Sequence, residues 1–170
     1  MEELAGGRIT PSSLRRLEQE DLECLRLLVA NWLRWIESAG HSATVDLPKV
    51  GLLADRSLEI AAALDSIDWR DHWAQGMTIG LSRPTEASMA DADFHFRRAQ
   101  EMAPQVATPS IDRIQAWARI GVNTETLVQE LVALGKADFP IHDNALYCAQ
   151  NRHALKRAIG LLAQLRSKSE

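Results

Sequence analysis

The chain has 170 residues, of which 46% are hydrophobic and 25% are charged, so its composition is close to that of an average soluble globular protein. This composition excludes extensive disorder, and we expect a single helical domain over 1–170 with flexible ends at 1–10 and 166–170. The formal net charge of −4 argues against general affinity for nucleic acids.

The first predicted helix spans 12–39. Thr10 and Pro11 provide its cap and first turn and Gly40 ends it, which gives a length of about 40 Å. Its apolar residues form two sets, namely Leu14, Leu17, Cys24, Leu28, Trp32 and Trp35, and Leu22, Leu25, Val29, Leu33 and Ile36. Over 22–36 the helix is therefore apolar on much of its circumference, which indicates that it is central to the fold or shared with a partner.

The next stretch contains one clear helix and one uncertain segment. Asp46 and Pro48 begin a predicted helix that carries apolar residues as far as Ile67. A short helical turn follows over 68–76, with an aspartate as its cap and a glycine as its stop. The segment 77–86 has glycine and proline breaks around a short apolar run, and a loop or one extended stretch both fit it.

Two long helices are predicted in the second half of the chain. Thr85 opens one that Pro104 closes, with apolar residues at steps of three and four. The last helix follows a segment with Asp138, Pro140 and Asp143, and it carries two apolar stripes. Since no segment alternates with a period of two over the length of a strand, the sequence predicts an all-α bundle of five or six helices with short connections.

Between these two helices, residues 108–135 predict a helical hairpin. Thr108 and Pro109 resemble a cap and first turn, Gly121 can adopt the left-handed conformation that ends a helix, and Asn123 can cap the second helix. This layout fits a helix-turn-helix that reads DNA and equally a hairpin that only packs within a bundle.

In the DNA-reading alternative, the second helix would present uncharged polar side chains to the bases, namely Asn123, Thr124, Thr126 and Gln129. Glu125 and Glu130 lie among them without a basic neighbour, and Trp117 is bulky where the motif usually has a small residue. The packing hairpin is therefore favoured. A DNA-associated regulator that uses this hairpin or the basic C-terminal helix stays open as an alternative.

Acid and histidine pairs at a spacing of four residues suggest a second alternative, a metal-binding or catalytic bundle. The pairs are Glu37 with His41, Asp68 with His72, Asp91 with His95, and Asp138 with His142. On a helix this spacing brings a carboxylate and an imidazole together, and Asp68, His72, Asp91 and His95 are the candidate ligands. Surface ion pairs are the favoured interpretation, because the known zinc and di-iron motifs are absent.

Tryptophans and a basic last helix give the main functional hypothesis. Five of the nine aromatic residues are Trp, and Trp69 and Trp73 are four residues apart, so they share one face. If exposed, they would anchor a partner, although rings on such a stripe more often fill the core. Basic residues for charge complementarity are Arg152, Lys156 and Arg157.

We therefore expect a non-catalytic protein that acts through protein–protein interaction or self-association as a homo-oligomer. No catalytic residue and no cofactor is predicted, since phosphate-binding loops, dinucleotide fingerprints and nucleophile elbows are missing. The acidic N-terminus and the lack of a long apolar run predict a cytoplasmic protein without a membrane partner. Cys24 and Cys148, both within helical patterns, suit a reducing compartment.

Overall fold

Every long element in the described part of the chain is an α-helix. The computed structural model describes residues 9–82, 84–121, 124–137, 139 and 145–167. Its long helices are α3 (Leu22–Ala39), α4 (Leu47–Ala63), α5 (Trp69–Leu81), α6 (Glu86–Met102), α7 (Thr108–Ile120), α8 (Thr124–Lys136) and α9 (Ala145–Ser167). The predicted all-α bundle is confirmed, with one more long helix than the upper number expected.

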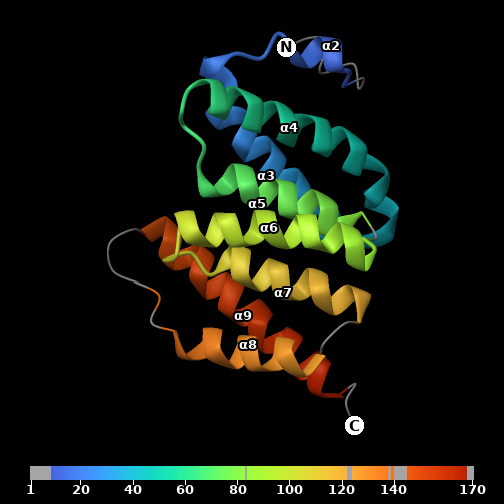
Figure 1. The fold of residues 1–170 in the computed structure, drawn as a ribbon, viewed down its shortest axis with the longest axis vertical. Coiled ribbons are helices and arrows are strands. Elements are labelled where there is room, and N and C mark those ends of the chain that lie inside the picture. Colours follow the sequence, from blue (N-terminus) through green and yellow to red (C-terminus); the bar gives the residue numbers. More distant parts are fainter. Residues whose placement is uncertain (1–8, 83, 122–123, 138, 140–144, 168–170) are drawn as a thin grey trace.

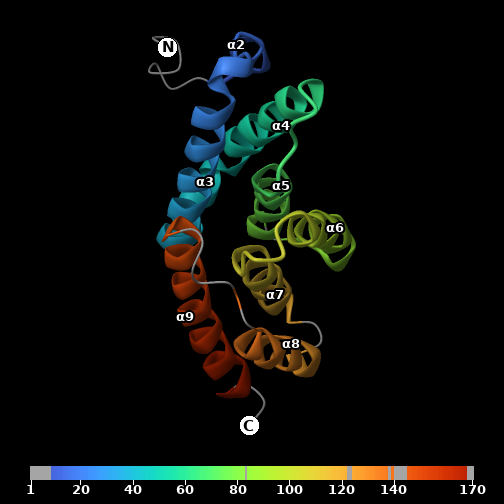
Figure 2. The same cartoon turned by 90° about the vertical axis from the view of Figure 1, so that its left-hand side faces the viewer.

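The helices α4 to α8 follow one another down the long axis of the molecule (Figure 1). Figure 2 shows α3 and α9 along one edge, with α5 to α8 on the other side. Two apolar cores result. One lies among α2 to α6, and the other lies among α7, α8 and α9. Trp117 on α7 packs against both cores, so α7 connects the two halves of the bundle.

The predicted helix over 12–39 is interrupted. The short helix α2 (Pro11–Leu14) is capped by Thr10, as expected, and the 3-10 turn η1 (Gln19–Asp21) precedes α3. The backbone N–H of Glu18 donates to the Asp21 carboxylate at 3.0 Å. This bond starts a new helical turn, because a side-chain acceptor replaces the carbonyl that a continuous helix would supply. With 18 residues, α3 is about 27 Å long.

The helix α5 is longer than the sequence predicts. Asp68 caps it by accepting a 2.7 Å hydrogen bond from the Arg70 N–H, as expected. The helix then continues through Gly76 and Gly80 to Leu81. A Cβ atom at Gly76 would lie 3.0 Å from the Phe96 ring. These glycines are thus contact points with α6 and α7, and the predictions of a stop at 76 and of a loop or strand over 77–81 are wrong.

The other predicted helices are present with small shifts in their ends. The helix α4 ends at Ala63, four residues before the predicted end at Ile67. Asp65, just beyond the end of the helix, adopts a φ of 51°. Thr85 caps α6, as expected, through a 3.3 Å hydrogen bond from the Ser88 N–H. Asp138, Pro140 and Asp143, which were expected to introduce α9, lie outside the described residues.

The hairpin over 108–135 is confirmed as two helices joined at Gly121, which has a φ of 75°. Its first cap is placed one residue earlier than predicted, because Ala107 holds the N-cap position and Thr108 lies in the first turn. The predicted second cap, Asn123, falls outside the described residues. Within the described ranges no helix has the length and hydrophobicity needed to cross a membrane.

Candidate functional site

The two tryptophans predicted to anchor a partner differ in their surroundings. Trp73 is 4% exposed, and its indole N–H donates a 2.7 Å hydrogen bond to Asp112. The Arg34 guanidinium lies over the Trp73 ring, 5.0 Å from its centroid. Trp69 is half-buried and meets Trp73 edge to face at 6.5 Å. Trp73 is therefore a core residue, which corrects the expectation that both rings form an exposed docking face.

Asp112 on α7 is the centre of a buried ionic network. Its carboxylate accepts hydrogen bonds from Arg34 at 3.1 and 2.7 Å and pairs with Arg157 at 2.8 Å. Burial alone would raise the pKa of Asp112, but the charges of Arg34 and Arg157 and the hydrogen bonds from Arg34 and Trp73 lower it below its usual value. The carboxylate is therefore ionised, and it connects α3, α5, α7 and α9.

The basic residues predicted on α9 thus have different roles. Arg157 is committed to Asp112 and Glu37, so it stabilises the fold and is not available as a free surface cation. Arg152 and Lys156 are exposed. Because Arg157 binds Glu37 near the C-terminal end of α3, these exposed cations lie on the helix beside that end of α3.

A second buried network joins α3 to α5. Arg26 is 7% exposed, and its guanidinium donates to both carboxylate oxygens of Asp71, at 3.1 and 2.5 Å. The Ser57 hydroxyl donates to Asp71 at 2.8 Å, and the Ser66 carbonyl accepts from Arg26 at 2.8 Å. Each buried charge therefore has an opposite charge and hydrogen-bond partners, without which its burial would strongly destabilise the fold.

A cavity of about 760 Å³, here called the α3–α9 cavity, adjoins these two networks, because Arg26 and Arg34 are among its lining residues. Its lining comes from α3, the start of α5, the α6–α7 connection and the first turns of α9. Trp69, Trp73 and Tyr147 provide aromatic surface, and Gln150 and His153 provide polar groups. This volume falls within the range of sites that hold small molecules.

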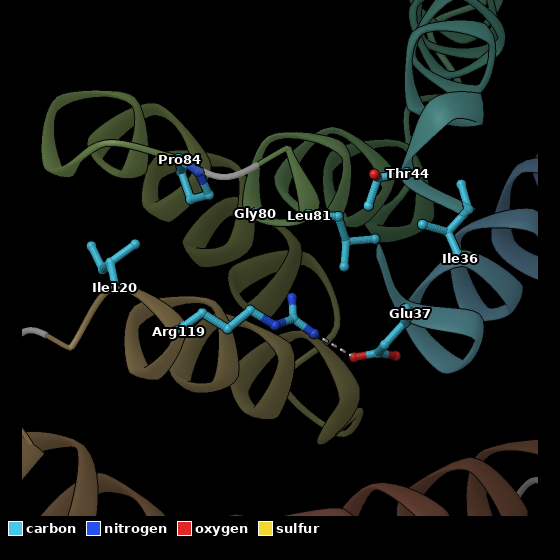
Figure 3. A pocket seen from close by; sticks show the side chains of 9 residues that line it. Ile36, Glu37, Thr44, Gly80, Leu81, Pro84, Arg119 and Ile120 are labelled. Atoms are coloured by element: carbon cyan, nitrogen blue, oxygen red, sulfur yellow. Dashed lines mark hydrogen bonds and ion pairs between the residues drawn. The ribbon is translucent and has the colours of Figure 1, made fainter. Parts of the chain in front are cut away.

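A smaller pocket of about 370 Å³ lies where the ends of α3, α5 and α7 meet (Figure 3). Glu37 and Arg119 face each other across it, with a 3.3 Å hydrogen bond between them. Glu37 also binds Arg34 and Arg157. The charged groups of this pocket are thus already engaged with one another, which leaves little to recognise a ligand.

The candidate metal ligands are only partly brought together. The Nδ1 atoms of His72 and His95 lie 3.1 Å apart, at the distance of a hydrogen bond between one protonated and one unprotonated nitrogen. Asp68 is engaged by Arg70 at 2.5 Å, and Asp91 is exposed. Among the described residues, no three His, Cys, Asp or Glu side chains are arranged to hold a metal ion.

The candidate DNA-reading residues lie on an acidic helix. Thr126 and Gln129 are exposed and Thr124 is half-buried on α8. Glu130 binds Arg113 on α7, and Trp117 donates a 3.0 Å hydrogen bond to Asp93 on α6. The first contact joins the two helices of the hairpin to each other, and the second joins the hairpin to α6, as the packing alternative expects.

The outer face of α3 is apolar and exposed. We use this name for Cys24, Leu27, Leu28, Asn31 and Trp35. Leu27, Leu28 and Trp35 are 58%, 47% and 50% exposed, respectively. The sequence predicts that the helix is apolar on much of its circumference over 22–36, and the structure places this helix at an edge of the bundle (Figure 2). Of the two explanations for this pattern, a central place in the fold and an interface shared with a partner, the position at an edge does not fit the first.

Comparisons with protein families, curated proteins and solved structures found no match to this chain.

Proposed function

We propose that the protein acts by self-association through the outer face of α3, without chemistry of its own. One observation carries this proposal: α3 is apolar on two sides, but among the described residues only its inner side is covered. Single exposed apolar residues are common on monomers, whereas a group on one helix face usually marks an interaction site. Since α3 lies at an edge, a partner is the remaining reason for its second apolar side.

The spacing along this face fits a second copy of α3. Cys24, Leu28, Asn31 and Trp35 are separated by four, three and four residues, which is the alternation of a coiled-coil seam. In a twofold-symmetric antiparallel pair, Leu28 would meet the partner's Asn31, and Cys24 would meet the partner's Trp35. Two copies of this chain can therefore cover each other's outer face of α3, without a different protein as partner.

Charge favours the antiparallel arrangement. Glu23 at the start of α3 is paired with Arg26 and Arg70, whereas Glu18 and Glu20 are exposed acids just before the helix. In a parallel pair these acids would repel their copies. In an antiparallel pair they approach the C-terminal end of the partner's α3, where α9 carries the exposed Arg152 and Lys156. Arg152 and Lys156 would then provide the charge complementarity predicted for partner binding.

The oligomeric state of charged variants tests this proposal. Size-exclusion chromatography with light scattering should show a dimer for the natural protein and a monomer for Leu28→Glu and Trp35→Glu. Ile159→Glu and Phe94→Glu are matched controls, because these residues are 70% and 62% exposed on other helices. They should remain dimeric. A monomeric natural protein, or equal effects in the control variants, would contradict the proposal.

A further inference from the structure

Two histidines from neighbouring helices face each other where α5 and α6 pack side by side (Figure 1). His72 lies on α5 and His95 lies on α6, and both rings are half-buried. Their Nδ1 atoms are 3.1 Å apart. Among the described residues neither ring forms an ion pair with a carboxylate, and Asp68, four residues before His72, is bound by Arg70 instead. The two imidazoles are therefore each other's polar partners.

The contact between the two Nδ1 atoms requires something positive between them. At 3.1 Å both nitrogens cannot carry a hydrogen, so at least one of them presents its lone pair. A proton can bridge the pair as a hydrogen bond, and a metal ion can replace that proton. In a tetrahedral zinc site with Zn–N distances of about 2.05 Å, two ligand nitrogens lie about 3.3 Å apart. The rings therefore need to separate by only a few tenths of an ångström and tilt toward the ion.

An exposed phenylalanine fixes the orientation of both rings. Phe94 meets His72 and His95 edge to face, with ring centroids 6.5 and 5.3 Å apart, respectively. Phe94 is itself 62% exposed, so the cluster lies at the surface, where a hydrated ion can reach it. Ligands that neighbouring side chains already hold in place lose less conformational entropy on binding.

The charges around the pair favour a cation. The carboxylates of Asp55 on α4 and Asp91 on α6 are both exposed, and both are close enough to act electrostatically on His95. Arg98 acts on the other histidine in the opposite sense, but its guanidinium is paired with an acid of its own helix at 2.9 Å. A divalent ion between the imidazoles would therefore be attracted by two carboxylates that no arginine of the described residues pairs with.

From this geometry we propose that His72 and His95 bind a divalent transition metal ion, such as Zn²⁺, through their Nδ1 atoms. Imidazole nitrogen suits zinc, copper and nickel ions, whereas magnesium and calcium ions require oxygen ligands. Because the described residues provide no group of three ligands, water takes the remaining positions. Such a site binds its ion reversibly, unlike a structural zinc site that four protein ligands close. The ion would join α5 to α6, apart from the outer face of α3.

Zinc alone is the probe for a test. The full chain, labelled with ¹⁵N, treated with a chelator and carrying Cys24→Ser and Cys148→Ser so that no thiolate competes, is titrated with zinc chloride. Two-dimensional NMR of the imidazole nitrogens should show saturation at a single ion per chain, with the Nδ1 signals of His72 and His95 shifted. Coordination through Nε2, or no saturable binding, would overturn the proposal, and the pair would then be a hydrogen bond alone.

Histidine variants in the same background provide a matched comparison. His72→Gln and His95→Gln should each weaken zinc binding by about tenfold or more, since loss of even an outer partner of a metal ligand costs that much. His153→Gln changes an exposed histidine of α9 and should leave the affinity unchanged. Each variant is first checked for a cooperative unfolding transition, and the NMR titration of the unsubstituted histidines decides where one fails to fold. Equal affinity in all three variants would contradict the proposal.

The metal site and the self-association can fail independently. Trp35→Glu should lose self-association and still bind zinc with the affinity of the natural protein, because Trp35 lies on α3 and the two histidines lie on α5 and α6. Loss of zinc binding in this variant would contradict a site formed by His72 and His95 within one chain.

Discussion

Asp112 lies on α7 with 2% of its surface exposed, and it accepts the indole N–H of Trp73 on α5 at 2.7 Å. The same carboxylate binds Arg34 from α3 and Arg157 from α9. Four helices that are distant in sequence therefore meet at one buried anion. Because each of its partners is a hydrogen-bond donor, the site is stable only while Asp112 is ionised.

Asp112→Asn should strongly destabilise the fold. The substitution leaves two guanidinium groups without their buried counter-charge, and removing one partner of a buried pair costs on the order of 3 kcal/mol or more. Urea unfolding followed by circular dichroism measures the loss. Glu125→Gln removes the same charge at an exposed position of α8 and should change the free energy of unfolding by less than about 0.5 kcal/mol. Similar losses in the two variants would show that the network is not stabilising.

Two glycine substitutions should have opposite effects. At Gly76 an added Cβ would lie 3.0 Å from the Phe96 ring, so Gly76→Ala should destabilise by about 1–3 kcal/mol. Gly160 lies within α9 with no neighbouring atom within 4 Å of an added Cβ. Gly160→Ala should therefore stabilise the protein by up to about 1 kcal/mol, through higher helix propensity. Thermal unfolding of both variants measures the effects, and a stabilising Gly76→Ala would contradict the close packing of α5 on α6.

The histidine pair predicts a loss of stability in mild acid. Burial lowers the pKa of His72 and of His95, and in His95 the neighbouring His72 lowers it further. Below the ordinary pKa of 6.5, the unfolded chain therefore binds more protons than the folded protein. The free energy of unfolding should fall as the pH decreases through 6.5, and it should level off below the folded pKa values.

Urea unfolding at a series of pH values between about 7 and 5 checks this dependence. His72→Phe keeps a ring at the position and should make the dependence shallower, whereas His153→Gln changes an exposed histidine and should not. A free energy of unfolding that stays constant over this range, or rises as the pH falls, would rule out this effect of burial.

Thiol crosslinking distinguishes the two orientations of an α3 pair. In the antiparallel arrangement, the two Cys24 residues lie about 16 Å apart along the helix axis, whereas two residues at position 31 lie about 5 Å apart along it. Dibromobimane should therefore crosslink Asn31→Cys, in a background with Cys24→Ser and Cys148→Ser. It should not crosslink Cys148→Ser, which retains Cys24. Crosslinking of both variants would indicate a parallel pair, in which every residue lies level with its own copy.

Local signals in the sequence predicted most of the helix ends correctly. Thr85 and Asp68 cap helices as expected, since a side-chain oxygen can satisfy the first free N–H groups in any tertiary context. Gly121 ends α7 for a similarly local reason, its positive φ. Gly76 was misinterpreted, because its role depends on Phe96 in another helix. A glycine that permits close packing has the same local sequence signal as one that ends a helix.

The candidate site was much less predictable. The partners of Asp112 are 39 to 78 residues away in sequence, and no local pattern predicts which arginine reaches which aspartate. One local signal does point to Asp112. Asp112 lies next to Ile111 in a mostly buried helix, which indicates an acid on an inward face. The sequence predicts that α3 carries apolar residues on two sides. Its position at an edge of the bundle depends on how all the helices pack, which no local pattern predicts.

Sedimentation equilibrium of the natural protein over a range of concentrations tests the central claim most directly. Self-association through the outer face of α3 predicts a mass that rises with concentration to twice the 18.9 kDa of one chain. In the same experiment, Trp35→Glu should stay at the mass of a single chain. A natural protein that remains at 18.9 kDa at every concentration would contradict the account.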